Sequence, residues 1–195
     1  MKNKTGQCSV MRLTMAAFCI TLNFVGAYIA LCLKLPIYMD SIGTIFAGAV
    51  LGPWYGMGTA FCSGVLSGIT SDIYAIYFLP SGMITGALAG YLFPRELFRK
   101  KWIPAGVACL TIPGTAVSAS ISAFLFHGVT SSGSSILVQL FSHLGLGMVM
   151  SAFAVQLVTE YADRFLACSL VLVLMSCMTA EMKLMLRGGQ SRGAV

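Results

Sequence analysis

Charged residues are scarce in this chain, and their scarcity excludes a soluble protein. Only 9% of the 195 residues are Asp, Glu, Lys or Arg, whereas 57% are hydrophobic and the mean hydropathy is +0.87. A soluble domain usually carries about 25% charged residues. Too few polar side chains remain to cover a solvated surface, so the composition predicts an integral membrane protein, embedded in a lipid bilayer, with one domain over residues 1–195.

The groups that enzymes and metal sites require are also few. The six acidic residues and two histidines suggest no Ser-His-acid arrangement, and the chain has no Walker A, GxSxG or HExxH motif. The seven cysteines are scattered, mostly within apolar runs, without a C-x-x-C pair. Because a metal site needs clustered ligands, we interpret these cysteines as small buried hydrophobes. We expect no enzymatic activity, no metal and no cofactor.

Basic residues outnumber acidic ones by twelve to six, but their distribution argues against nucleic acid as a partner. Ten of the twelve lie in three clusters beside apolar segments: Lys2, Lys4 and Arg12; Arg95 and 99–101; Lys183, Arg187 and Arg192. The positive-inside rule places such clusters on the cytoplasmic side of a membrane. We therefore predict an all-α polytopic membrane protein with cytoplasmic N- and C-termini. No basic cluster faces outward, which argues against a strongly anionic ligand.

Apolar runs predict the membrane helices. Residues 11–33 are about 20 residues long, enough to span the ~30 Å hydrocarbon core, and no A-x-A-like cleavage site follows them. A short run then begins near Ser41 and stops at the helix breaker Gly52-Pro53. Further helices are expected over 54–69, from about 82 to 93, and over 103–126.

The last third of the chain leaves two layouts open. Two apolar runs, 136–158 and 165–180, are separated by "TEYADR". If both crossed, seven spans would put the basic ends on opposite sides. We favour about six crossings, with 136–158 folded as a hairpin on the outer side, where protein must cover its backbone. In the alternative, 136–158 is the sixth span and the tail is buried or interfacial.

Polar and aromatic residues gather on the predicted outer side. With the N-terminus inside, segments 34–43, 70–82 and 127–135 all reach that face, and a few polar groups among aromatics are typical of a small-molecule pocket. The candidate ligand-binding residues there are Tyr38, Asp40, Ser41, Asp72, Tyr74 and Tyr77, with His127 nearby. Asp40 or Ser41 could instead cap the helix that begins near Ile42, and the tyrosines could form an interfacial belt.

Three further polar residues lie within apolar runs: Asn23, Gln139 and His143. Gln139 and His143 are four residues apart, so on a helix they would share one face. We consider all three as candidates for lining the pocket. Hydrogen bonding between helices is the alternative role.

Three motifs resemble a known family. "LPIYMDSIGTIFAGAVLGPWYG" (35–56) resembles the first loop and second helix of S components, the substrate-binding subunits of energy-coupling factor (ECF) transporters, in the riboflavin-transporter-like group. "HGVTSSGSS" resembles that family's Gly-Val-Thr-Gly-Ser-Gly loop, with Ser131 in place of the first Gly. "TEYADRF" resembles its Asp-x-x-Asp-Lys element, with Arg164 in place of Lys.

The resemblance implies a prokaryotic plasma-membrane subunit that binds a vitamin or vitamin precursor from outside. Such subunits have no ATPase of their own and associate with a transmembrane T component and two ABC-type ATPases. Small residues on the family's first helix dock the T component; the matching positions here are Ala17 and Thr21, or Gly26 and Ala30. The rival interpretations are a stand-alone secondary transporter, for which we find no internal repeat, and a structural or assembly protein.

Overall fold

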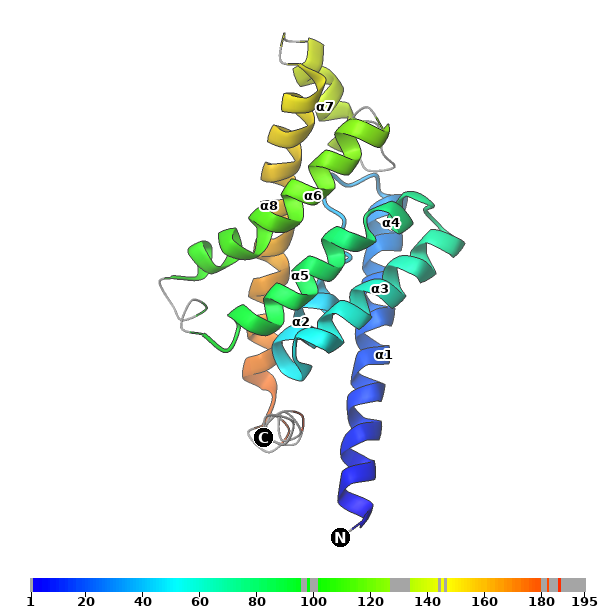
Figure 1. The fold of residues 1–195 in the computed structure, drawn as a ribbon, viewed down its shortest axis with the longest axis vertical. Helices are drawn as coiled ribbons and strands as arrows, with labels where there is room; N and C mark the ends of the chain where they lie inside the picture. The colour runs from blue at the N-terminus through cyan, green and yellow to red at the C-terminus, as the bar shows by residue number, and fades with distance from the viewer. Residues whose placement is uncertain are drawn as a thin grey trace.

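The protein is all-α over the part of the chain that the structure describes. This structure, a computed structural model, describes residues 2–95, 98, 102–126, 134–143, 145, 147–179, 182 and 186. These residues form helices and no strand (Figure 1). The helices are α1 (Lys2–Cys32), α2 (Ile42–Leu51), α3 (Pro53–Thr70), α4 (Tyr74–Tyr77), α5 (Leu79–Leu92), α6 (Ile103–Phe126), α7 (Ser134–His143) and α8 (Met148–Cys177).

The prediction of an all-α polytopic membrane protein is confirmed. Among the described helices, two are long and apolar enough to cross a bilayer by themselves, Val10–Cys32 within α1 and Ile103–Phe126, which is α6. α1 begins and α8 ends at the same end of the molecule, and α7 lies at the opposite end (Figure 1). This arrangement agrees with an even number of crossings.

Helix boundaries in the first two thirds of the chain follow the local sequence. Gly52 separates α2 from α3 with a φ of 106°, a conformation that glycine adopts without steric cost. Pro53 then occupies the first turn of α3, where its missing N–H is not needed by the helix. The predicted short helix before Gly52-Pro53, the returning helix after it and the helix over 103–126 are all observed.

The predicted division of the last third was wrong. "TEYADR" (159–164) does not separate two elements, because α8 runs through it without a break. The predicted hairpin over 136–158 is observed in part: α7 forms its first arm, the first turns of α8 form its second arm, and α7 packs against α8, but the second arm continues into the rest of α8. The connection between them includes Gly145, with a φ of 95°. The loop predicted over 127–135 lies mostly outside the described residues.

α2 is the central helix of the fold. All ten of its residues are buried, and it contacts α1, α3, α5 and α8. On one side the packing brings backbone against backbone: a Cβ on Gly48 would come within 2.6 Å of the Gly86 carbonyl oxygen, and one on Gly90 within 2.4 Å of the Pro53 nitrogen. Because protein surrounds α2, its ten residues do not have to match the bilayer thickness.

Candidate functional site

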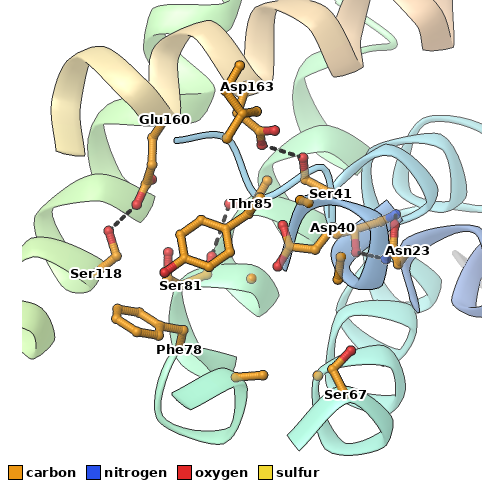
Figure 2. Close-up of a pocket in the computed structure, with 18 of the residues that line it drawn as sticks. Asn23, Asp40, Ser41, Ser67, Phe78, Ser81, Thr85, Ser118, Glu160 and Asp163 are labelled. Atoms are coloured by element: carbon orange, nitrogen blue, oxygen red, sulfur yellow. Dashed lines mark hydrogen bonds between the residues drawn. The ribbon is translucent and has the colours of Figure 1, made fainter. Parts of the chain in front are cut away.

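A pocket lies between the helices, beside the start of α2. Its volume is about 110 Å³, several times the roughly 10–15 Å³ that one water molecule requires. Residues of α1, the segment 33–41, α3, α5 and α8 line it, together with Ser118 of α6 and Ser134 of α7. Figure 2 shows part of this lining. A cavity of this size can hold a molecule of several atoms.

The segment 33–41 forms one wall of the pocket and is held by Asp163 of α8. The Asp163 carboxylate accepts the backbone N–H of Met39 at 3.0 Å through Oδ1 and the hydroxyl of Ser41 at 3.0 Å through Oδ2. Met39 has a φ of 53°, an uncommon conformation for a residue with a side chain. The segment also crosses α1 closely, since a Cβ on Gly26 would come within 2.3 Å of the Met39 carbonyl oxygen.

Asn23 of α1 fixes the start of α2. Its Oδ1 accepts the backbone N–H groups of Gly43 at 2.7 Å and Thr44 at 3.3 Å. Its Nδ2 donates to the hydroxyls of Thr44 at 2.8 Å and Ser63 at 3.2 Å. The first N–H groups of a helix have no partner within it, and the N-cap residue Ser41 makes no capping bond with its side chain. Asn23, fully buried, therefore caps α2 from another helix.

One face of α8 presents polar groups to the pocket. Gln156, Glu160 and Asp163 follow one another at intervals of four and three residues, the spacing of one helical face, and all three line the pocket. Glu160 accepts the hydroxyl of Thr115 at 3.0 Å and the hydroxyl of Ser118, both from α6. Figure 2 shows the Glu160 and Asp163 bonds from this face. The polar part of α8 thus faces the pocket and polar groups of neighbouring segments of the chain rather than lipid.

The pocket carries an excess of negative charge. Four of the six acidic residues of the chain line it, Asp40, Asp72, Glu160 and Asp163, against one cationic side chain, Arg164. Arg164 pairs with Asp163, with 3.3 Å between Nη1 and Oδ2. This balance is opposite to that of the whole chain, whose formal charge is +6.

Asp40 is the pocket carboxylate with the fewest partners. It lies in the irregular segment between α1 and α2, and its exposed surface faces the pocket. Asp40 is exposed, but it lines the pocket, where surrounding protein replaces part of the bulk water. This loss of water raises the pKa of its carboxyl to about 6, Arg164 opposes the shift, and Asp163 and Glu160 add to it. The N-cap residue of α2 is Ser41, so the interpretation of Asp40 as a helix cap was wrong.

Five of the nine predicted ligand-binding residues line this pocket: Asn23, Tyr38, Asp40, Ser41 and Asp72. Asp72 also accepts the backbone N–H of Tyr74 at 3.1 Å, which supports the short helix α4. Tyr74 and Tyr77 are not among the lining residues. Their rings meet the ring of Phe126 edge to face, with centroids 4.8 and 5.1 Å apart, and so attach α4 to the end of α6.

Gln139 and His143 are not brought to the pocket. Both are exposed on α7, and neither is among the lining residues. His127 lies outside the described residues.

The structure separates the two candidate docking pairs on α1. Gly26 is covered by Met39, and Ala30 is buried and lines the pocket. Ala17 and Thr21 are exposed, with the Thr21 hydroxyl bonded to the Ala17 carbonyl at 3.1 Å. Ala17 and Thr21 are therefore the pair that remains accessible to another subunit.

Sequence reasoning missed Gln156, Glu160, Asp163 and Arg164, because it assigned the last three to a connection. A signal was present on α6, where Thr111, Thr115, Ser118 and Ser122 recur at intervals of four, three and four residues. This is a polar stripe along one face of an otherwise apolar helix. Such a stripe indicates a polar partner on the helix packed against it, and α6 packs against α8.

Comparison with known proteins gives one match. The model of the family described as "ECF transporter, substrate-specific component" matches residues 11–175. Neither a curated protein nor a solved structure matches the chain.

Proposed function

Because the chain belongs to the family of ECF transporter substrate-specific components, we propose that it captures a vitamin or vitamin precursor from outside the cell and delivers it to an ATP-driven importer. The substrate-specific subunit of such a transporter needs a binding site, and it needs partners for the energy-dependent step. The family match covers the described helices that build the pocket, α1 to α8, apart from the first residues of α1 and the last of α8.

The pocket is the observation that carries this proposal. It lies among helices drawn from the whole length of the chain, and it combines apolar surface with many polar and charged side chains, which can orient a small molecule. The polar groups are held in advance: hydroxyls of α6 orient Glu160, and Asp163 fixes the segment 33–41. Preorganised groups of this kind lower the cost of ordering on binding.

The partners in this proposal are a transmembrane T component and two ABC-type ATPases in a prokaryotic plasma membrane. The chain contains no nucleotide-binding motif, so ATP hydrolysis has to come from other subunits. The exposed pair Ala17 and Thr21 offers a small-residue surface on α1, and small residues allow helices to approach closely in lipid.

The test is to purify the tagged protein from cells grown in rich medium and to identify the co-purifying small molecule by mass spectrometry. Uptake of that molecule is then measured in proteoliposomes. We expect the protein alone to bind the molecule without accumulating it, and the protein with its co-purifying ATPase subunits to accumulate it when ATP is enclosed. Accumulation by the lone protein without ATP would contradict the proposal and favour a secondary transporter. Absence of any bound molecule would favour a structural role.

A further inference from the structure

The charges in the pocket are unevenly compensated. Asp163 is satisfied by the Met39 N–H, the Ser41 hydroxyl and the Arg164 guanidinium. Among the described residues that line the pocket, Arg164 is the one cationic side chain, and it forms an ion pair with Asp163. Among the described residues, no cation lies within ion-pair distance of Asp40 or Glu160. In the described part of the chain neither carboxylate therefore has an ion pair of its own, although Arg164 lies near enough to act on the charge of Asp40.

A second, independent observation concerns Gln156. Its side chain lines the pocket one helical turn before Glu160 and is 8% exposed. Its Oε1 is buried and has no hydrogen-bond donor within the described part of the chain. A buried acceptor without a donor is unfavourable, because burial removes the hydrogen bonds that water would give it. Oε1 and the two carboxylates are all acceptors, so a ligand that satisfies them has to donate hydrogen bonds.

The arrangement does not match a bound metal ion. No group of three or more His, Cys, Asp or Glu side chains among the described residues is placed to hold one. The carboxylates come instead from separate elements, Asp40 from the segment 33–41 and Glu160 from α8, and the ring of Phe78 borders the same space. Separated charges with an aromatic ring bordering the same space suit an extended ligand with an apolar body, because aromatic faces also attract cations.

We propose that the ligand of this pocket is a small organic cation, a ring or short chain bearing a protonated or quaternised nitrogen, which lies between Asp40 and Glu160. The proposal rests on the proposed function and names the class of molecule that this site takes. Arg164 retains one buried donor, Nε, without an acceptor, so the cation also carries a hydrogen-bond acceptor. The positive charge of the ligand then offsets part of the excess negative charge of the pocket.

The test uses three probes that share a phenyl ring and differ in charge: benzylammonium, benzyl alcohol and benzoate. Each is added at millimolar concentration to the full-length protein, freed of any co-purifying molecule, and the melting temperature is measured. We expect benzylammonium to bind about tenfold or more tightly than benzyl alcohol. Both can donate a hydrogen bond to a carboxylate, but only benzylammonium does so with a charged donor, and charged groups strengthen a hydrogen bond by about this factor in the dissociation constant. Benzoate should bind least. Equal effects of the cation and the alcohol, a preference for benzoate, or no effect of any probe would overturn the proposal.

Single substitutions test which residues cause the preference for the cationic probe. Asp40→Asn and Glu160→Gln each remove one charge at nearly constant shape, and each should reduce the preference for benzylammonium over benzyl alcohol. Asp40→Glu retains the charge and is the matched control that should retain the preference. Ser118→Ala removes a hydroxyl that Glu160 accepts but no charge, so it should weaken binding without removing the preference. A cation preference unchanged in both charge-removing variants would refute the assigned site.

The result separates this inference from the proposed function. If mass spectrometry finds a co-purifying molecule that is neutral or anionic at neutral pH, the protein is still a binding subunit and the cation proposal fails. If no small molecule of any charge binds, the proposed function itself fails.

Discussion

At the scale of single residues, two carboxylates in the same pocket have different tasks. Asp163 is 6% exposed and receives three donors, one of them the backbone N–H of Met39. It acts on the shape of the site, since without it the segment 33–41 would lose its attachment to α8. Asp40 stands on that segment and faces the cavity. Asp163 therefore positions the segment that carries Asp40. The Asp40 carboxylate faces the cavity, where a ligand could contact it.

The raised pKa of Asp40 predicts how stability depends on pH. The carboxyl titrates near 6 in the folded protein, against 3.8 ordinarily, mainly because of lost water, with Asp163 and Glu160 adding to and Arg164 opposing the effect. A raised pKa means that the folded state binds the proton more tightly, so stability falls as pH rises from about 4 to about 6. The Asp40→Asn variant has no carboxyl at this position, so its stability should not fall for this reason as the pH rises.

The measurement is the melting temperature of the empty protein and of Asp40→Asn across that range. We expect the variant to melt higher than the original protein above about pH 6, and the difference to disappear near pH 4, where the original carboxyl is also neutral. A difference that stays constant across the range would show that the charge of Asp40 has no such cost.

At the scale of helices, the predictable elements are those whose ends are encoded locally. Gly52-Pro53 specifies the boundary between α2 and α3 through backbone preferences alone, and α6 is a long apolar run with matching ends. α8 was not predictable in this way, because "TEYADR" is polar in a context that suggests a connection. Its acidic residues are accommodated within a helix by partners far away in the chain, Thr115 for Glu160 and Met39 for Asp163.

The candidate site likewise contains residues that local sequence predicts and residues that it does not. Tyr38, Asp40 and Ser41 were found because they follow a membrane helix and lie at its predicted outer end. Gln139 and His143 were suggested by a shared helical face, but that face is exposed. A helical period shows which residues share a face, and it does not show which neighbour the face meets. The polar stripe on α6 was the better guide, since Thr and Ser hydroxyls on an apolar helix need a polar partner.

Glycine contacts between α3 and α5 give a prediction at this scale. A Cβ on Gly86 would come within 2.4 Å of both the carbonyl carbon and the carbonyl oxygen of Gly56, so Gly86→Ala must separate the two helices. Overpacking of this kind costs about 1–3 kcal/mol or more. Gly58→Ala, on α3, is the matched control because nothing lies within 4 Å of its Cβ. We expect a lower melting temperature for Gly86→Ala and an unchanged or slightly higher one for Gly58→Ala. Equal melting temperatures would contradict the packing.

At the scale of the whole molecule, charge is segregated by position. The net charge of the chain is +6, and most of the basic residues lie in clusters beside apolar segments. Most of the acidic residues are gathered instead in one pocket. The positive-inside rule predicts that basic clusters of this kind orient the chain in the membrane. In the function proposed above the acidic residues serve the binding site, so each sign of charge would have its own role.

The last prediction concerns orientation. α1 ends just before Lys34, beside α4 in the upper half of Figure 1, and α8 ends just before Thr179, in the lower half. If the basic ends are cytoplasmic, Lys34 faces outward and Thr179 inward. Both residues are exposed, so Lys34→Cys and Thr179→Cys are suitable probes. They are introduced singly into a background in which Cys8 and the exposed cysteines, Cys32, Cys62, Cys109 and Cys177, are replaced by Ser.

A membrane-impermeant maleimide is then applied to intact cells. We expect it to label Lys34→Cys directly and Thr179→Cys only after the membrane is permeabilised. The background protein is the control, because its remaining cysteines, Cys19 and Cys168, are buried and should not react. Labelling of both variants from the same side would refute an even number of crossings, and labelling of Thr179→Cys alone in intact cells would invert the orientation. In the second case the pocket would open to the cytoplasm, and it could not be filled from outside in the way we propose.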